Sequence, residues 1–469
     1  MATTTVSIGS NQSIDTETPA TSSGSGPSYV VTFGTTPAGI HIGDIGFMDT
    51  ENAGGGGASD YTFLVTAISG DNITLKYLTD TASKGDASPL GLYTGSGTSG
   101  SPQQAAMVFK RAFSTITLFE AMIDDASPDY WGSSDDVVGE LHADSNFTDA
   151  TVNFNQKQSL SSVTLSVYSD DRHDGTAESG ALWKPTSGSG HNVGILVMNV
   201  DNMTAEWLDI SADSLDSTNT NKFIVLGANC NNNIIRNNLL HDKGGNPGNT
   251  GPLGIYNSGA GASSDSIYIL NNIIYNLVET NNDSAAAMLL NVWAGNAYVY
   301  NNTIYNIQGA GGSKHGIGIR FGNVTSSNTR IKNNLVSKTE GPSNNAPYWK
   351  NVSGSTVDSA NNLSDDTASA TYNAEDMGQN LNDSSALIGK TAAQIDFVST
   401  SAGSEDLHLD TSSVCLQAGV DLGTTNGVNI DIDGIDRDAT GVTWDIGADQ
   451  KSTADSGSAG KAFLIFLDI

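Results

Sequence analysis

The sequence is short of basic residues. Lys and Arg number 20 against 51 Asp and Glu, which gives a formal net charge of −31, and charged residues make up only 15% of the 469 residues. A chain this acidic repels phosphate backbones, so we expect no nucleic-acid partner, and polyanionic glycans would need bridging cations. The surface must therefore consist mostly of uncharged polar residues.

Cysteines, long apolar runs and helix-forming windows are also scarce. Cys230 and Cys415 lie far apart without a CxxC spacing, and we expect two buried free thiols. No run approaches the ~20 apolar residues of a membrane-spanning helix, so no membrane partner is expected. Leu, Ala, Glu and Lys dominate no long window, which disfavours long helices. The N-terminus has neither the basic start nor the apolar stretch of a secretory signal, from which we expect assembly in the cytoplasm.

Asparagine is abundant, with 44 residues, and much of it belongs to an internal repeat. Asparagine pairs followed by two mostly apolar residues recur at steps of 34, 30, 32 and 28 residues. A second series has the same period: Ile255, Leu289 and Ile319 each lie 17 residues after the second asparagine of a pair. Alternating apolar residues before each pair indicate short strands. The pairs are Asn237–Asn238, Asn271–Asn272, Asn301–Asn302, Asn333–Asn334 and, more weakly, Asn361–Asn362.

This period predicts a coiled ribbon of strands. Asparagine tolerates the left-handed backbone region well, so it can turn the chain between two strands. If each coil bends at the same place, the amides stack and hydrogen-bond along the axis, while apolar neighbours such as Ile235, Ile273 and Ile304 point inward. The expected fold is all-β, a right-handed parallel β-helix with coils roughly 4.8 Å apart. The expected asparagine ladder consists of Asn238, Asn272, Asn302, Asn334 and Asn362.

The repeat resembles those of the pectate-lyase-like superfamily of parallel β-helices, over about residues 137–450. Asp431-Ile-Asp-Gly-Ile-Asp-Arg437 followed by Trp444-Asp-Ile-Gly-Ala-Asp449 resembles a closing motif, DxDG…R…DIGA, at the end of many bacterial and phage β-helix proteins. Three further segments resemble β-helix proteins of tailed phages of aquatic bacteria, which implies a structural or adhesin protein of a tailed phage. These segments are residues 113–120, 138–147 and 172–176.

Four divisions of the chain are expected. Residues 1–105 form a small β-rich attachment domain, 106–136 a linker and capping helix, 137–450 the β-helix, and 451–469 a Ser/Gly linker and an apolar C-terminal strand. The helix begins after Ser114 and covers the apolar end of the solenoid. The C-terminal strand is expected to lock a homo-oligomer, by analogy a trimer. Its apolar residues are Phe463, Leu464, Ile465, Phe466 and Leu467.

Enzymatic candidates are few. A polysaccharide lyase or glycoside hydrolase on a β-helix needs paired acids, or a basic residue that often works with calcium. Solvated loop charges are the commoner explanation of such groups. The first candidates, from the clusters around His241 and Lys314, are Asp242, Lys243, Lys314, His315 and Arg320.

Binding candidates come from aromatics and from the closing motif. Trp293 and Trp349 lie beside repeat strands and could stack on sugar rings, whereas Tyr275 and Tyr305, at equivalent positions, look like stacked solenoid residues. Asp431, Asp433 and Asp436 crowd three carboxylates together, as in calcium loops, although the EF-hand spacing is not met. The alternative is a tight turn neutralised by Arg437. No other cofactor is expected.

These observations favour a virion structural protein exposed on a tailed phage. It would be a head decoration or fibre, or a tail-associated adhesin, with itself, other virion proteins and a host-surface glycan as partners. The β-helix would provide a rigid platform for stabilising the shell or binding the host surface. The rival is a depolymerase, a lyase or hydrolase on the same β-helix. A third reading is a bacterial surface adhesin exported without a cleaved signal, which would place the chain outside the cell.

Overall fold

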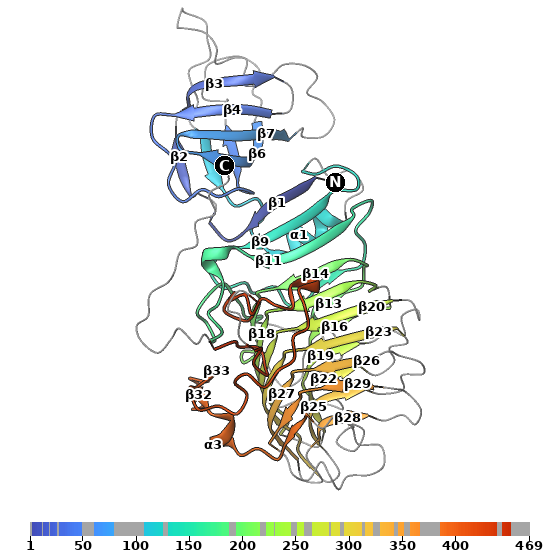
Figure 1. The fold of residues 1–469 in the computed structure, drawn as a ribbon. Coiled ribbons are helices and arrows are strands. Elements are labelled where there is room, and N and C mark those ends of the chain that lie inside the picture. The colour runs from blue at the N-terminus through green and yellow to red at the C-terminus, as the bar shows by residue number, and fades with distance from the viewer. Residues whose placement is uncertain are drawn as a thin grey trace, which may run out of the picture.

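The structure is a computed structural model whose regular elements are almost all strands (Figure 1). Among the described residues no helix is long and apolar enough to cross a membrane. The described residues are 2–11, 13–17, 19–25, 28–48, 61–78, 107–124, 130–186, 194–215, 222–228, 230–244, 251–257, 265–280, 283–290, 295–311, 315–321, 329–341, 346–350, 357–365, 385–438 and 443–451.

Three parallel sheets form the body of the molecule, and successive strands of the chain belong to the first, third and second sheet in turn. The first sheet contains β1 (Thr3–Ile8), β9 (Asp136–Leu141), β11 (Ser162–Val167), β14 (Met203–Glu206), β17 (Asn233–Arg236), β20 (Ser266–Leu270), β23 (Asn296–Tyr300), β26 (Thr329–Lys332) and β29 (Val357–Ala360). The second contains β10 (Val152–Phe154), β13 (Gly194–Met198), β16 (Lys222–Leu226), β19 (Leu253–Asn257), β22 (Ala285–Leu290), β25 (Gly316–Phe321) and β28 (Ala346–Lys350). The third contains β12 (Leu182–Trp183), β15 (Asp209–Ser211), β18 (Leu239–Gly244), β21 (Ile273–Val278), β24 (Thr303–Gln308), β27 (Leu335–Glu340), β30 (Leu363–Ser364) and β31 (Leu387–Ile388).

Strand register makes this body a parallel β-solenoid, which confirms the expected fold class. In the first sheet Ile235 pairs with Ile269, which pairs with Val299, so equivalent residues of successive coils lie one above another. All three are buried in one continuous apolar core. Because every coil is hydrogen-bonded to the next, the core grows along the axis and not outward.

The asparagine pairs lie at the turn from the first sheet to the third, and their two members do different work. The second asparagine of each pair is buried, and its side-chain Nδ2 donates to the Oδ1 of its equivalent in the next coil. The distance is 2.9 Å from Asn238 to Asn272, 3.0 Å from Asn272 to Asn302 and 2.9 Å from Asn302 to Asn334. The backbone N–H of each also donates to that Oδ1. A last step of 3.0 Å joins Asn334 to Asn362.

The first asparagine of each pair takes the left-handed conformation, with φ between 52° and 57°. Its amide points outward and donates to carbonyl oxygens of residues 418–431. Asn271, for example, donates to Val428 and Ile430, at 3.2 and 2.7 Å. The pair is thus a turn, an internal ladder and a docking site for a later part of the chain.

That later part, residues 391–438 and 443–451, covers the outer face of the third sheet. It includes β32 (Phe397–Ser399), β33 (Asp406–Leu409) and a short helix α3 (Ala392–Ile395). Leu239 and Ile273, at the starts of their strands, pack under Leu407 and Ile432 of this segment. The expectation that Ile273 points into the solenoid is therefore wrong, because strand alternation puts Ile274 inside, whereas Ile235 and Ile304 do face the interior.

The closing motif holds this C-terminal segment together. The fully buried guanidinium of Arg437 donates to the carbonyls of Gly447 and Ala448, at 3.0 and 2.8 Å, and to the side chain of Gln450, at 3.1 Å. The carboxylate of Asp431 accepts the backbone N–H groups of Ile435 and Gln450. These contacts satisfy buried main-chain groups in a stretch with little regular structure.

An antiparallel sheet stands at the N-terminal end of the solenoid (Figure 1). Pairing places β1 in the solenoid and β8 in this antiparallel sheet, and the expected domain limits otherwise remain a prediction. The antiparallel sheet has the order β2 (Asp15–Glu17), β8 (Met107–Lys110), β5 (Ile45–Met48), β6 (Tyr61–Ser69), β7 (Asn72–Leu78), β4 (Ser28–Phe33) and β3 (Pro19–Ser25).

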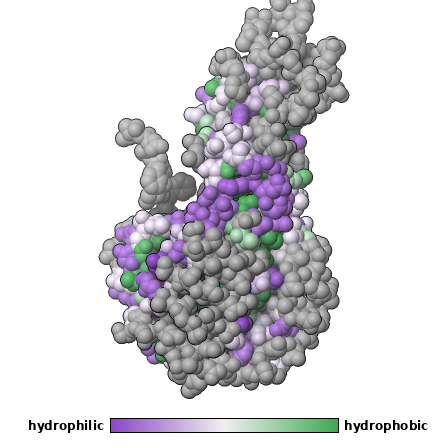
Figure 2. Space-filling view, turned by 90° about the vertical axis from the view of Figure 1, so that its right-hand side faces the viewer, coloured by the Kyte–Doolittle hydropathy of each residue, from purple (hydrophilic) through white to green (hydrophobic). Residues whose placement is uncertain are grey.

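The expected capping helix is α1 (Ile116–Ile123), whose Ile116, Phe119 and Ile123 are buried in the solenoid core. Its N-cap is Thr115, one residue after the expected Ser114, since the Thr115 hydroxyl accepts the backbone N–H of Leu118. Figure 2 shows the right-hand face of Figure 1, where hydrophilic residues form a band across the narrow part between the antiparallel sheet and the wider body.

Candidate functional site: a groove along the third sheet

A second set of left-handed residues follows each asparagine pair. Asp242, Asn276, Asn306 and Lys338 each lie four positions after the second asparagine and have φ between 54° and 59°. Each interrupts its strand of the third sheet, because the pairing passes over these positions. Asn306 Nδ2 donates to Asn276 Oδ1 at 2.7 Å, and Asn276 Nδ2 donates to Asp242 Oδ1 at 2.8 Å. A polar ladder therefore runs along the outside of the solenoid.

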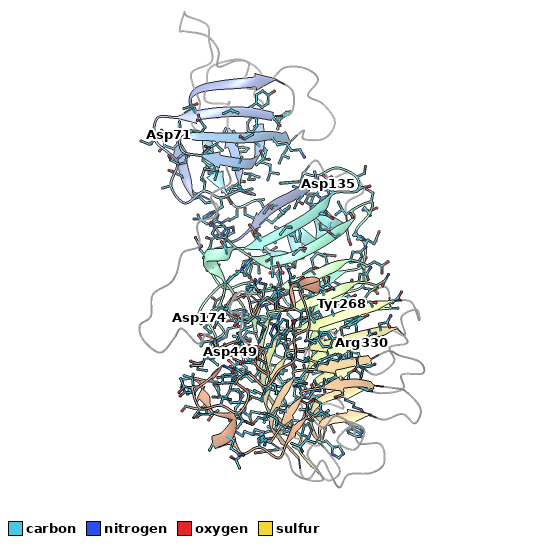
Figure 3. The ribbon with its side chains drawn as sticks, viewed as in Figure 1. Asp71, Asp135, Asp174, Tyr268, Arg330 and Asp449 are labelled. Carbon is cyan, nitrogen blue, oxygen red and sulfur yellow. The ribbon has the colours of Figure 1, made fainter. Side chains whose placement is uncertain are left out.

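This outer ladder lines two adjoining cavities of about 540 and 480 Å³: Asp242 contributes to both, and Asn276, Asn306 and Lys338 contribute to the second. Tyr275 lines the first and Tyr305 the second, in register one coil apart. Residues 400–406 of the C-terminal segment form one side of both, and residues 176–178 contribute to the first. We call the two cavities together the axial groove, because they follow the solenoid axis. Figure 3 shows Asp174 and Asp449 on this side of the molecule and Tyr268 and Arg330 on the other.

Carboxylates line both cavities of the axial groove, with Asp213, Asp242 and Glu405 at the second. Glu178, Asp242, Glu405 and Asp406 line the first cavity. Asn276 Nδ2 donates both to Asp242 Oδ1, at 2.8 Å, and to Glu405 Oε1, at 2.9 Å. Because both oxygens are bonded to one nitrogen, they lie at most about 6 Å apart, close to the carboxyl separation of retaining glycosidases.

A buried histidine fixes the position of Asp242. His241 Nδ1 lies 2.7 Å from Asp242 Oδ2, and its Nε2 lies 2.8 Å from Oδ1 of the buried Asp209. Burial alone would lower the pKa of His241, but hydrogen bonds to the two carboxylates outweigh it and raise the pKa to about 9. Burial of Asp242 opposes its ionisation, yet the hydrogen bond from His241 lowers its pKa. The pair is therefore charged at neutral pH.

The tyrosine hydroxyls of the groove are not used by the fold. Tyr275 is 2% exposed and stacks on His241 at a centroid distance of 5.2 Å, and Tyr305 is 7% exposed. Neither hydroxyl has a hydrogen-bond partner among the described residues, although each tyrosine lines a cavity. Burial, followed by the charges of Asp242 and Asp209, raises the pKa of Tyr275. Both hydroxyls are thus available to a polar ligand.

The structure separates the enzymatic candidates. Asp242 lines the groove, but Lys243 is 1% exposed and donates to the carbonyl of Leu215 at 3.3 Å. His315 and Arg320 lie at the second sheet, away from the groove, and Lys314 lies outside the described residues. The five candidates therefore do not form one site.

Of the two aromatic candidates, the structure describes only Trp349. One face of Trp349 is covered by Arg320, whose Cζ lies 4.3 Å from the ring centroid, and His315 contacts the same ring edge-on at 5.0 Å. A ring covered in this way has less free face for a sugar. Trp293 and the strand Phe463–Leu467 lie outside the described residues, so their roles remain predictions.

The three candidate calcium ligands point to different partners. Asp431 accepts main-chain N–H groups, Asp433 faces His408 at 3.1 Å, and Asp436 accepts from the Asn429 side chain at 2.8 Å. Asp433 instead belongs to a group with His408 and Asp449, whose ligand atoms lie within 4.8 Å of one another. Burial alone would lower the pKa of His408, but hydrogen bonds to Asp406 and Asp433 raise it to about 11, so ion pairing accounts for the group.

Sequence reasoning missed most of the groove. Asn276, Asn306 and Lys338 had a usable signal, their constant offset of four from the asparagine ladder. Glu405 and Asp406 had none, because no repeat connects residues 400–406 to the coils that they cover.

Comparisons with known proteins add little to this geometry. No family model matches the chain, and no curated protein matches it. Among solved structures, the tailspike protein gp49 from Pseudomonas phage LKA1 is similar at 12% sequence identity, over 76% of this chain and 67% of that chain, with a TM-score of 0.15. A similarity this low carries no argument, so the class of the protein, a parallel β-solenoid with an axial groove, follows from strand pairing and cavities alone.

Proposed function

We propose that this chain is a virion component of a tailed phage that presents a rigid solenoid at the particle surface and binds a host-surface glycan in the axial groove. The groove carries the binding part of the proposal. It combines tyrosines, amides and carboxylates along one line, and such groups bind the hydroxyl-rich, partly apolar surface of sugars. The virion part rests on the resemblances of the sequence, and head and tail positions both remain open.

Binding to purified host envelope glycans tests the groove. Asn306→Gly removes an amide from the floor and keeps the left-handed backbone easy to adopt. We expect it to weaken binding about tenfold, as the loss of one or two good hydrogen bonds does. Asn202→Gly is the matched control, because Asn202 is also left-handed, with φ 53°, but lies outside the groove. Equal effects of the two variants would refute a glycan site in the groove.

Immunogold labelling of purified particles tests the virion part. Antibodies against the solenoid are expected to mark the head or the tail of intact phage. Particles that carry no label, from a lysate containing the protein, would exclude a virion component.

A depolymerase is the second candidate, favoured by the closeness of Asp242 and Glu405. His241 keeps Asp242 ionised, which suits a nucleophile, and Glu405 supplies the second carboxyl group that retaining hydrolysis requires. Release of reducing ends from host polysaccharide, abolished by Asp242→Asn and by Glu405→Gln, is the expected result. Binding without release would leave the protein an adhesin.

A further inference from the structure

We propose that the axial groove recognises a protonated primary amine on its glycan, as in an amino sugar that is not acetylated. The amine would lie among Glu178, Asp242, Glu405 and Asp406, within reach of the Tyr275 hydroxyl. This inference rests on the proposed glycan-binding function and names the substrate class of the same site.

The charges of the first cavity do not cancel. Asp242 shares one imidazolium with the buried Asp209, Asp406 shares another with Asp433, and Glu178 shares the Lys184 ammonium with Asp213. Glu405 accepts from the Asn276 amide and the Gly403 N–H, at 2.9 Å each, and has no ion-pair partner among the described residues. Neutral donors leave its charge in place, so the cavity favours a cation.

The Tyr275 hydroxyl is an independent sign of a missing donor. Its side chain is almost fully buried and lines the cavity, and its hydroxyl makes no hydrogen bond within the described part of the chain. The hydroxyl is therefore open to the cavity and can accept a hydrogen bond from a ligand there. An ammonium group offers three donors, which suits one phenol oxygen and two carboxylates.

The second cavity makes the two ends of the groove different in charge. Lys338, the last residue of the outer ladder, places its Nζ 5.4 Å from the Tyr305 ring centroid. Asp213, Asp242 and Glu405 also line the second cavity, but a cation is disfavoured beside the Lys338 ammonium, so the amine is expected at the Glu405 end and uncharged sugar hydroxyls at the Asn306 end. The ligand therefore extends along the axis over more than one coil.

Calorimetric titration with matched oligosaccharides tests the inference. We expect the glucosamine tetramer to bind and the N-acetylglucosamine tetramer to bind at least about tenfold more weakly, because acetylation removes the charge. Rising ionic strength is expected to weaken only the first. Equal affinities would overturn the inference and leave glycan binding itself standing.

Two groove variants and one control assign the effect to residues. Glu405→Gln keeps an acceptor for Asn276 but removes the charge, and Tyr275→Phe removes only the hydroxyl. Each is expected to weaken glucosamine tetramer binding about tenfold and to leave the weak binding of the acetylated tetramer unchanged. Asp358→Asn changes the net charge of the protein by the same amount as Glu405→Gln, but Asp358 lies on the first sheet, where it pairs with Lys332. This control is expected to have no effect on binding. A control that behaves like Glu405→Gln would show nonspecific attraction to an acidic protein and overturn the inference.

Tetralysine separates an amino sugar from other amines. If it binds more weakly than the glucosamine tetramer, the sugar ring contributes and the inference is supported. If it displaces the tetramer with equal affinity, the site binds amines in general and the amino-sugar assignment fails. Host glycan binding that depends on Asn306, with no binding of the glucosamine tetramer, would overturn this inference alone; loss of the Asn306 effect would overturn the proposed function.

Discussion

At the residue scale, each asparagine pair divides two tasks between neighbours. The first member accepts a left-handed backbone and docks the C-terminal segment, and the second is buried and bonded to its equivalents. One coil departs from this rule, because Trp207 has φ 61° at the position of the first asparagine and Leu208 occupies the second. The Leu208 N–H still donates to Asn238 Oδ1 at 3.0 Å. The hydrogen bonds of the inner asparagine ladder therefore begin one coil before the asparagine pairs appear in the sequence.

Replacing an inner asparagine should cost much stability. Asn302→Leu leaves the N–H and amide of Asn272, and the carbonyl of Ile269, without their partner. We expect the free energy of unfolding to fall by about 3 kcal/mol, measured by urea denaturation. Asn153→Leu, at an exposed position of β10 with an ordinary strand backbone, is the control. A loss below about 1 kcal/mol for Asn302→Leu would show that the inner asparagine ladder contributes little to the stability of the fold.

His241 should make stability depend on pH. Its pKa is about 9 in the folded chain and near 6.5 when unfolded, so its stabilisation is complete below pH 6.5 and is lost as pH rises through 9. The difference in unfolding free energy between the wild type and His241→Gln should therefore shrink between pH 6 and pH 9.5, by on the order of 3 kcal/mol. A difference that stays constant over this pH range would show that a protonated His241 does not stabilise the fold.

At the element scale, the C-terminal segment acts as a strap that completes both the fold and the site. It covers outward apolar residues of the third sheet and supplies Glu405 and Asp406 to the groove. Main-chain carbonyls of the segment accept the outer asparagine amides, so docking needs few particular side chains. The groove exists only while the segment is docked.

Thiol labelling can show whether this segment opens separately. Burial raises the pKa of both Cys230 and Cys415 to about 12, so neither thiol should react with iodoacetamide in the native state near pH 8. In moderate urea we expect Cys415, in the segment, to react before Cys230, in the solenoid core. Single Cys→Ser variants identify each site by mass spectrometry. Simultaneous labelling would mean that segment and solenoid unfold as one unit.

At the scale of the whole molecule, one buried arginine joins the antiparallel sheet to the solenoid. Arg111, beside β8, lies 3.0 Å from Asp44, before β5, and 2.9 Å from Asp144, after β9. Arg111→Met would leave two carboxylates facing each other without a cation. We expect a loss of about 3–5 kcal/mol at this junction and faster proteolysis between the two parts.

Arg330→Met is the matched control for this junction. Arg330 pairs with the exposed Asp358 at 3.8 Å, so its loss should cost less than about 1 kcal/mol. Unchanged proteolysis of Arg111→Met would show that the apolar contacts at the junction suffice.

Assembly should depend on the apolar end of the chain. The expected homo-oligomer should convert to monomers in multi-angle light scattering when residues 462–469 are deleted, because an apolar strand added to a neighbouring subunit would be buried there. Replacing Phe463 and Phe466 by Ser should have the same effect without shortening the chain. An unchanged mass in both variants would remove this strand from the interface.

The sequence alone determined the solenoid, because a parallel coil must repeat its turn residues wherever the backbone repeats its conformation. The spacing of Asn238 and its equivalents therefore predicted both the length of one coil and the position of the turn between the first and third sheets. The outer ladder from Asp242 to Lys338 carried the same kind of signal.

Only the tertiary structure decided where the functional site lies. The C-terminal segment has no repeat, and its docking depends on the summed shape and polarity of five coils, from which no local pattern places Glu405 beside Asp242. Nor does local sequence distinguish Ile273, covered by that segment, from Ile274, enclosed by the coil. Long-range packing creates the groove, whereas short-range periodicity builds the solenoid that supports it.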